Sequence, residues 1–472
     1  MSDKIVLSLD IGTSSLCGLA LSCESLQPIA ICSEVNDTEI ANLSAGCHEQ
    51  GPLRIQDLCL GLIQKLLSKK EVHENEVVGI GITGQMHGLL LVNSELEPQS
   101  NLIMWRDQRT LESGNAGNID EAVGVLGTDV HQRTGCRLHA GYGGATLYWL
   151  LKNDKIPEGA VALTIADYMA GCLTEVIATE ATHAASWGIF NLQKNMWDME
   201  AIDRLGIPKK VLPTLNSATK PLGTVQPVIA KQFGLGDNVQ VCSPVGDNQA
   251  SIIGATGFAG DAAVLNLGTG GQISIPQKEY KFVETLETRP MPFGGFILVG
   301  ASLCGGWVYS YLQKFIQGTV QKFVGVEVSD EEIYNRMNEI AAETEEGASG
   351  ITVDTRFGGT RLDPNLRGII SGIGVENFTI ANLARGFIEG MVRELADMAT
   401  AAGVKDFTRI IASGNAVRRN PAVPDVIESI FGLPCFISAN REAAALGAAY
   451  SAAIGLGLVS KGDICPGLER RR

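Results

Sequence analysis

One short pattern occurs twice in this chain, near the start of each half. Residues 9–15 spell LDIGTSS and residues 265–271 spell LNLGTGG, and each copy joins two apolar segments. That arrangement predicts a β-hairpin with glycine and threonine in its turn. A chain that carries this hairpin twice is expected to fold as two related α/β units.

The segments after each hairpin follow a similar order of elements. The expected strand, helix and strand span residues 29–31, 54–68 and 77–83 in the first half, and residues 296–300, 380–402 and 409–412 in the second. A further helix is expected over 420–431, with Asn420 as its N-cap and Pro421 at its first helical position. We therefore predict two similar α/β domains with insertions, residues 1–255 and 256–472, with the active site in the cleft between them.

The bulk composition argues against several classes of partner. The chain has 472 residues, more than one hydrophobic core usually supports, and a formal net charge of −15. Nucleic acids and anionic membranes select basic surfaces, so we expect neither as a partner. The eleven cysteines contain no C-x-x-C pair, which argues against a zinc site or a disulfide framework and favours the reducing cytoplasm.

One uncharged stretch, residues 443–460, is long enough to be considered as a membrane span. It consists mostly of alanine and glycine, whose transfer into lipid gains little free energy. We expect instead a buried, closely packed helix followed by a glycine-rich turn.

The two hairpin turns offer a site for a nucleotide. Glycine lets backbone N–H groups approach phosphate oxygens closely, and two facing turns can hold one triphosphate from both sides. Asp10 precedes the first turn, where the second copy has Asn266, so one carboxylate is available to hold Mg²⁺. Either turn taken alone is equally compatible with an ordinary hairpin. The candidate phosphate ligands are Gly12, Thr13 and Ser14 in the first turn and Gly268, Thr269 and Gly270 in the second.

Asp247 is the candidate catalytic base. It follows the apolar residues 239–241 closely and stands just before the second half begins, at the expected cleft. A sugar hydroxyl attacks phosphorus efficiently only if its proton is removed in the transition state, and a positioned carboxylate can accept that proton. The alternative is that Asp247 is the N-cap of a helix that starts near residue 250, and the two roles are compatible.

Two motifs in the first half carry side chains suited to a sugar. Gln85 and His87 follow the buried strand 77–83, at the edge of the sheet where α/β proteins bind ligands, and both can hydrogen bond to hydroxyl groups. Trp105 could cover the apolar face of a sugar, and Asp107 could accept hydrogen bonds from its hydroxyls. The alternatives are a structural histidine in the first motif and a solvated turn with an internal ion pair in the second.

A third motif follows the strand expected at 409–412. Gly414, Asn415 and Ala416 stand between that strand and the next helix, where a glycine could admit a flat adenine against the backbone. Many α/β proteins have a glycine turn at this place, so the motif alone is weak.

Together these motifs resemble those of the FGGY carbohydrate kinases, in the same order and over nearly the whole chain. The motifs are DIGTS at 10–14, GQMHG at 84–88, WRDQR at 105–109, GDNQ at 246–249, LGTGG at 267–271 and SGNA at 413–416. The resemblance implies two RNase H-like domains of the actin-like ATPase type that close on ATP. It also implies Mg²⁺ as a cofactor, a small-molecule ketose as the substrate, and an enzyme that acts as a monomer or homodimer.

The resemblance assigns roles residue by residue. Asp247 would be the base, Asp10 would lie by Mg²⁺, and the residues named above in the two turns and in the SGNA motif would bind the nucleotide. The residues implied at the sugar are Gln85, Met86, His87, Trp105, Asp107, Asp247 and Asn248.

Within the family the chain is most similar to the sedoheptulose kinases, and xylulokinases, which share GQMHG and GDN, are the nearest rival. Glycerol kinases usually carry an Arg-Glu pair where this chain has Gln85 and Met86, which disfavours glycerol. Gly270 and Gly271 depart from the Ser/Thr-rich second loop common in sedoheptulose kinases, which weakens that assignment slightly. A non-catalytic sensor of sugar or nucleotide is the alternative from another functional class.

Overall fold

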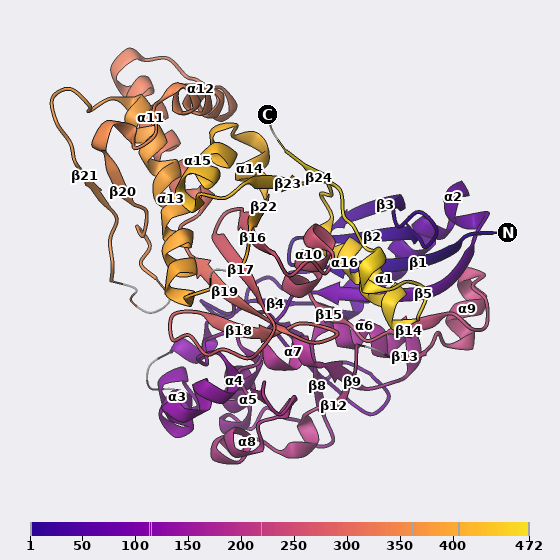
Figure 1. Ribbon diagram of the computed structural model, residues 1–472. Helices are drawn as coiled ribbons and strands as arrows, with labels where there is room; N and C mark the ends of the chain where they lie inside the picture. The colour runs from indigo at the N-terminus through magenta and orange to yellow at the C-terminus, as the bar shows by residue number, and fades with distance from the viewer. Residues whose placement is uncertain are drawn as a thin grey trace.

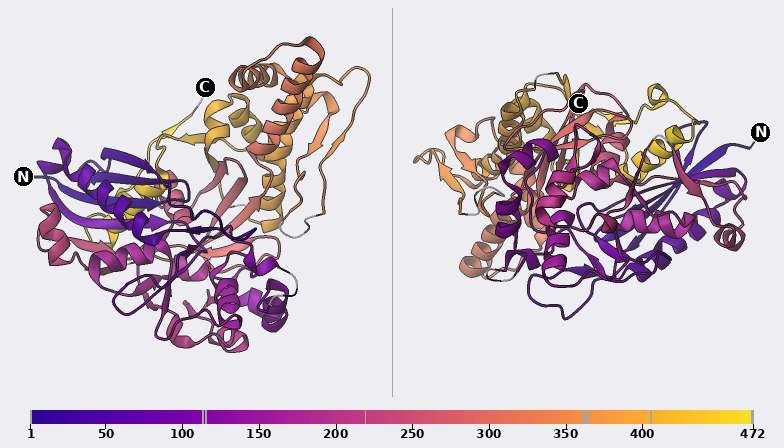
Figure 2. Two further views of the ribbon diagram at one scale, coloured as in Figure 1. Left: turned by 180° about the vertical axis from the view of Figure 1, so that it is seen from behind. Right: turned by 90° about the horizontal axis from the view of Figure 1, so that it is seen from below.

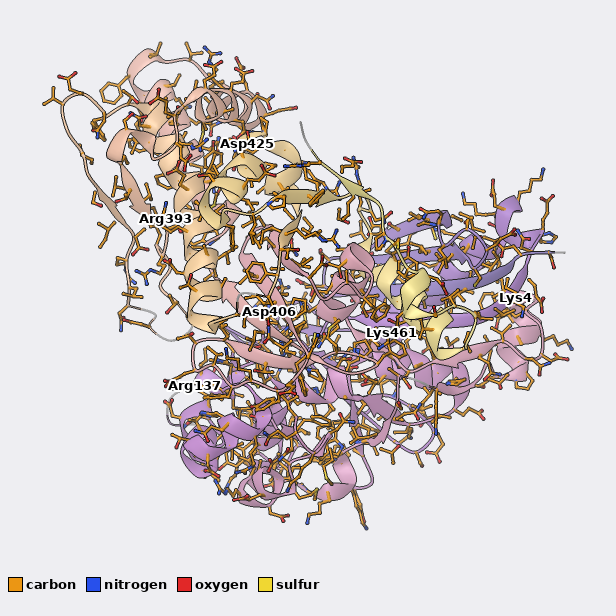
Figure 3. All side chains as sticks on the ribbon, viewed as in Figure 1. Lys4, Arg137, Arg393, Asp406, Asp425 and Lys461 are labelled. Carbon is orange, nitrogen blue, oxygen red and sulfur yellow. The ribbon has the colours of Figure 1, made fainter. Side chains whose placement is uncertain are left out.

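The computed structural model describes residues 2–470 except 113, 115, 219, 361, 362, 364 and 405. Within the described residues the chain forms two seven-stranded mixed sheets, one in each half, with helices packed against them (Figure 1). In Figure 3, Lys4 marks the outer end of the first half, and Asp425 lies in the second half, far from it. The predicted α/β fold with two domains and insertions is confirmed.

The first sheet begins with the predicted hairpin. Its order is β13-β14-β5-β1-β2-β3, with β15 also paired to β5. Strands β1, β2 and β3 are antiparallel neighbours, whereas β5 runs parallel to β1 and to β14, and the edge strand β13 is antiparallel to β14. The bounds are β1 Lys4–Ile11, β2 Ser15–Ser22, β3 Pro28–Val35, α1 Pro52–Leu67, β5 Glu76–Gly84, α6 Ile165–Thr174, β13 Pro221–Thr224, α9 Pro227–Phe233, β14 Gln240–Cys242, β15 Val245–Gly246 and α10 Asp247–Thr256.

The second sheet repeats this plan. Its order is β18-β19-β17-β16-β22-β23-β24, in which β16, β17 and β19 are antiparallel, β22 runs parallel to β16 and to β23, and β24 is antiparallel to β23. β18 is an additional edge strand. The bounds are β16 Ala262–Leu267, β17 Gly271–Gln277, β18 Glu287–Pro290, β19 Phe296–Ser302, α13 Ile380–Ala402, β22 Arg409–Ser413, α14 Asn415–Arg419, α15 Ala422–Phe431, β23 Cys435–Ser438, α16 Ala443–Gly455 and β24 Leu468–Glu469.

Insertions extend both halves. Between β5 and β14 an insertion has its own apolar core, built around Trp187 and Tyr148, and contains α3 Ile119–Leu126, α4 Thr128–Thr134, α5 Gly143–Lys152, α7 Ala181–Ala185 and α8 Met199–Leu205. Between β19 and α13 a second insertion forms the outer end of the C-terminal half (Figure 1), with α11 Gly306–Val324, α12 Asp330–Glu343, β20 Thr352–Asp354 and β21 Ile369–Ser371. Among the described residues no helix is long and apolar enough to cross a membrane.

The alanine-rich stretch forms α16, as predicted, but the helix packs in the other half of the molecule. It lies against β1, β2 and β5 of the first sheet and against α10, and both views in Figure 2 show it beside the indigo strands. Its apolar residues surround the whole helix, which suits burial on all sides. Small residues allow this contact: a Cβ on Gly447 would lie 1.8 Å from the Ala250 carbonyl oxygen.

One expected helix boundary is wrong. The helix predicted over 420–431 begins at Ala422, because Asn420 closes the short helix α14 instead. Its side-chain oxygen still accepts a hydrogen bond from the Ala422 backbone N–H at 3.0 Å, so it caps the new helix from two residues upstream.

Candidate active site

Asp10 lies at the end of β1, in the middle of the first sheet, with Thr83 of β5 and Cys17 of β2 beside it. Its Oδ1 is buried and has no hydrogen-bond partner among the described residues. Burial, together with the nearby carboxylates of Asp247 and Glu442, raises the pKa of Asp10 to about 8. An unpartnered carboxylate oxygen beside other acids is a donor suited to a divalent cation.

Asp247 is the first residue of α10 and directly follows β15, which pairs with the end of β5. Gly246 is the N-cap and no side chain caps this helix, so the alternative role of Asp247 as an N-cap is wrong. Burial raises the pKa of Asp247, the guanidinium of Arg289 and backbone N–H groups oppose this rise, and the resulting pKa is about 6. The carboxylate therefore loses its proton near neutral pH, which suits a general base.

Asp10 and Asp247 face one cavity of about 760 Å³ between the halves. The predicted residues that line it are Asp10, Gly12, Asp247, Asn248, Gly414 and Asn415. Other predicted residues lie outside the lining, namely Thr13, Ser14, Gln85, Met86, His87, Trp105, Asp107, Gly268, Thr269, Gly270 and Ala416. Sequence reasoning did not assign a role to the other lining residues, among them Ser251, Gln272, Ser274, Arg418, Arg419, Arg441 and Glu442.

The two glycine turns are tight, and each is closed by its own backbone. Gly12 N–H donates to the Ser15 carbonyl at 3.0 Å, and a Cβ on Gly12 would lie 2.7 Å from the same oxygen. In the second turn Gly268 N–H donates to the Gly270 carbonyl at 3.0 Å. Gly306 at the start of α11 donates to the Gly268 carbonyl at 2.9 Å, so the turn rests on that helix.

The SGNA motif meets the second turn. Gly414 has φ of +98°, and a Cβ there would lie 2.4 Å from the Leu267 carbonyl oxygen, so only glycine fits without strain. Asn415 and Ala416 begin α14 immediately afterwards. Two arginines on this helix, Arg418 and Arg419, line the cavity. Their position four and five residues after Gly414 was the available sequence signal for cations beside a phosphate site.

The first turn is braced by the polar residues predicted to bind sugar. Thr13 Oγ1 accepts a hydrogen bond from Trp105 Nε1 at 2.9 Å and donates to Gln85 Oε1 at 3.4 Å. Gln50 links Thr13 to Gln85, since its Nε2 donates to the Thr13 carbonyl and its Oε1 accepts from Gln85 Nε2. Gln85 is buried, so the structure places it in this support, whereas Trp105 is 43% exposed.

His87 is held by the protein and also faces an aromatic residue that the sequence did not reveal. Its φ of +72° is unusual for a residue other than glycine. Its N–H donates to Ser186 Oγ at 3.0 Å, and its Nδ1 lies 2.7 Å from the Ser186 carbonyl, which places the ring proton on Nδ1. The ring stacks on Tyr142 with 4.2 Å between centroids. Met86, the preceding residue, is buried beneath Gly246.

The contacts of Asp107 indicate a structural role. Its side chain is 1% exposed, Oδ1 accepts from Arg109 Nε at 2.8 Å, and Oδ2 accepts from His48 N–H at 2.7 Å. Arg109 also pairs with Glu49 at 2.6 Å. The internal ion pair considered for this motif exists, but the expectation that it is solvated is wrong, because the cluster is buried.

Comparison with known proteins agrees with the duplicated fold. The N-terminal domain of the FGGY family of carbohydrate kinases matches residues 5–254, and its C-terminal domain matches residues 263–456. The mouse sedoheptulokinase is 27% identical over 94% of this chain and 96% of its own length, and the xylulose kinase of Haemophilus influenzae is 28% identical over 94% and 90%. A gluconate kinase structure from Lactobacillus acidophilus superposes with a TM-score of 0.84, at 23% identity over 100% of this chain and 94% of its own. The chain belongs to the FGGY family of carbohydrate kinases.

Proposed function

We propose that this chain transfers the terminal phosphoryl group of ATP to the primary hydroxyl of a ketose, and that sedoheptulose is the substrate, giving sedoheptulose 7-phosphate. One observation carries the proposal: Asp10 and Asp247, two carboxylates with raised pKa values, face one cavity that is also lined by Gly12 of the first turn and Gly414 of the SGNA motif. In that reading the enzyme acts in the cytoplasm, as a monomer or homodimer, in carbohydrate metabolism that feeds the pentose phosphate pathway.

Asp247 would accept the hydroxyl proton as the sugar oxygen attacks phosphorus. Its place at the start of α10 orients the carboxylate, because backbone N–H groups of Asp247 and Asn248 hold it. Asn248, which also lines the cavity, is positioned to contact the sugar.

Asp10 fits a magnesium site. Its buried Oδ1 is without a partner, and no group of three or more acidic, histidine or cysteine residues that could hold a metal occurs in the described part of the chain. Mg²⁺ bound through one or two carboxylates, water and substrate phosphates needs no such group. When bound, Mg²⁺ would supply neutralisation of phosphate charge.

The nucleotide would lie between the glycine turns and the SGNA motif. Backbone N–H groups around Gly12, Thr13 and Ser14 and around Gly268, Thr269 and Gly270 would approach the phosphates, while Gly414, Asn415 and Ala416 would lie beside adenosine. Arg418, Arg419 and Arg441 add positive charge to this cavity, which attracts a triphosphate to an otherwise acidic protein.

The choice of sugar rests on motif resemblance. The motifs shared with sedoheptulose kinases favour sedoheptulose, and xylulose is the second candidate because the GQMHG and GDNQ motifs occur in both groups. Trp105, exposed next to the first turn, and His87 with Tyr142 would border the sugar. Asp107 is proposed to act only by holding the 105–109 loop.

The test is Mg²⁺-dependent ADP release with sedoheptulose, xylulose, ribulose and glycerol supplied in parallel. The highest kcat/KM is expected with sedoheptulose. A preference for xylulose or ribulose would overturn the substrate and leave the ketose kinase standing. If none of the four compounds stimulated ADP release while the protein still bound ATP, the sensor alternative would be favoured.

A further inference from the structure

An ion pair on β18 reaches the candidate base from the other half of the molecule. Arg289 and Glu287 lie on this edge strand of the second sheet, whereas Asp247 and Asn248 begin α10 in the first half. Sequence reasoning assigned no role to β18. The strand is the element of the second sheet that is additional to the repeated plan.

Arg289 contacts both sides of this boundary. Its Nη1 donates to Asn248 Oδ1 at 3.2 Å, while its Nε and Nη2 donate to Glu287 Oε2 at 3.1 and 2.6 Å. The side chains of Arg289 and Glu287 are only 11% and 14% exposed. A guanidinium held by a two-point contact has a fixed orientation, so Nη1 is aimed at Asn248 rather than free to move.

Glu287 also contacts the first half of the chain, next to the GQMHG motif. The Tyr142 hydroxyl donates to Glu287 Oε1, and the Tyr142 ring stacks on His87. The series His87, Tyr142, Glu287, Arg289 and Asn248 therefore runs from the GQMHG motif to the residue beside the base.

The backbone of β18 is fastened to the first half as well. Thr288 N–H donates to the Gly135 carbonyl at 2.8 Å, and Gln249 Nε2 donates to the Pro290 carbonyl at 3.1 Å. An exposed pair between Arg137 and Glu284 lies near the same boundary, at the position labelled Arg137 in Figure 3. These contacts fix the guanidinium relative to α10.

We propose that Arg289, oriented by Glu287, is a positioning residue that fixes Asn248 and Asp247 for proton removal from the sugar. A residue of the C-terminal half would thus position the base that the N-terminal half supplies. This inference rests on the proposed kinase function. Its direct consequence is on turnover, since Arg289 acts on the residues that meet the reacting hydroxyl and lies outside the glycine turns and the SGNA motif.

The test compares Arg289→Met and Arg289→Lys with a matched control, Arg385→Met. Arg385 forms an equally buried pair with Glu389 at 2.7 Å, within α13 and outside the cavity lining. The measurements are kcat, KM for sugar and ATP, and the midpoint of thermal unfolding.

Arg289→Met is expected to lower kcat about 100-fold while KM for ATP stays within about twofold. Arg289→Lys should recover only part of that loss, about tenfold, because its ammonium can still donate to Asn248 but cannot form the two-point contact with Glu287. Arg385→Met should keep kcat within about twofold while it lowers the unfolding midpoint. The inference is overturned if Arg289→Met lowers kcat no more than Arg385→Met, or if Lys recovers nothing. Either result would leave the proposed kinase function standing. That function would be overturned only if the wild-type protein showed no sugar-dependent turnover.

Discussion

At the scale of single residues, the account depends on two carboxylates that the fold keeps close together and largely out of water. Burial raises the free energy of the ionised form of both carboxylates, and the charge of Asp247 adds to this cost for Asp10. Ionisation of either carboxylate therefore lowers the free energy of unfolding. Such a cost is typical of functional sites, where a bound ligand offsets it.

The first prediction concerns the stability of the protein without ligands. The pKa of Asp10 is about 8 in the folded state and near 4 when unfolded, so the folded state binds the proton more tightly and loses stability as pH rises between these values. Asp10→Asn removes this ionisation and should stabilise the protein by up to about 5 kcal/mol at pH 8. Thermal unfolding at pH 8 and pH 4.5 measures the effect, and the variant should match the wild type at pH 4.5. An equal gain at both pH values would show that charge is not the cause.

The second prediction concerns the pH dependence of turnover. With the pKa of Asp247 raised to about 6, the base is increasingly protonated below that pH. The kcat/KM for sugar should therefore fall about tenfold for each unit below pH 6, because this ratio reports ionisations of the free enzyme. A pH profile at saturating Mg²⁺ and ATP measures it. An acidic limb near pH 4 would mean that burial does not raise the pKa of the base.

At the scale of elements, α10 and α16 connect the site to the rest of the fold. α10 carries Asp247 at its first residue and packs against α16, which belongs to the second half in sequence but covers the first sheet. Their close contact uses glycine on both helices: a Cβ on Gly254 would lie 1.9 Å from the Ala443 carbonyl, and one on Gly447 would lie 1.8 Å from the Ala250 carbonyl. The position of the base thus depends on how closely these helices approach.

The third prediction tests this contact with a matched pair of substitutions. Gly447→Ala must push α16 away from α10, which should cost about 2–4 kcal/mol of stability and lower kcat. Gly61→Ala lies in α1, where nothing is within 4 Å of the added carbon, and should be neutral or stabilise by about 0.5–1 kcal/mol. Chemical denaturation and steady-state kinetics measure both variants. Equal stability of the two would show that the helices can separate without cost.

At the scale of the whole molecule, the sequence revealed what is local and repeated. The two hairpins around residues 9–15 and 265–271, the helix at 380–402 and the buried strand at 77–83 follow from periodicity and turn residues, and all of them occur as predicted. The sequence could not predict that α16 packs against the first sheet, because an alanine-rich helix without a polar face does not indicate which surface it covers. Arg289, Glu287 and Tyr142 were missed because Tyr142 and Asn248 stand far from β18 in sequence, and only the packing of β18 brings them together.

The site was predicted in the same uneven way. Asp10, Asp247 and Gly414 were found because each follows a recognisable strand, and the ends of neighbouring strands meet at one edge of a sheet. Asp107 was assigned to the sugar from its residue type and from the resemblance of the WRDQR motif. Its burial against the His48 backbone could not be predicted, because that contact joins segments distant in sequence.

The most direct test of the account is sugar-dependent ADP formation by Asp247→Asn, compared with the wild type at the same protein concentration and with ATP binding measured in parallel. The account predicts a loss of kcat of about 10³-fold with ATP affinity nearly unchanged, because the variant keeps the shape of the side chain but cannot accept the proton. Turnover within about tenfold of the wild type would contradict the account, since the base would then have to be another group.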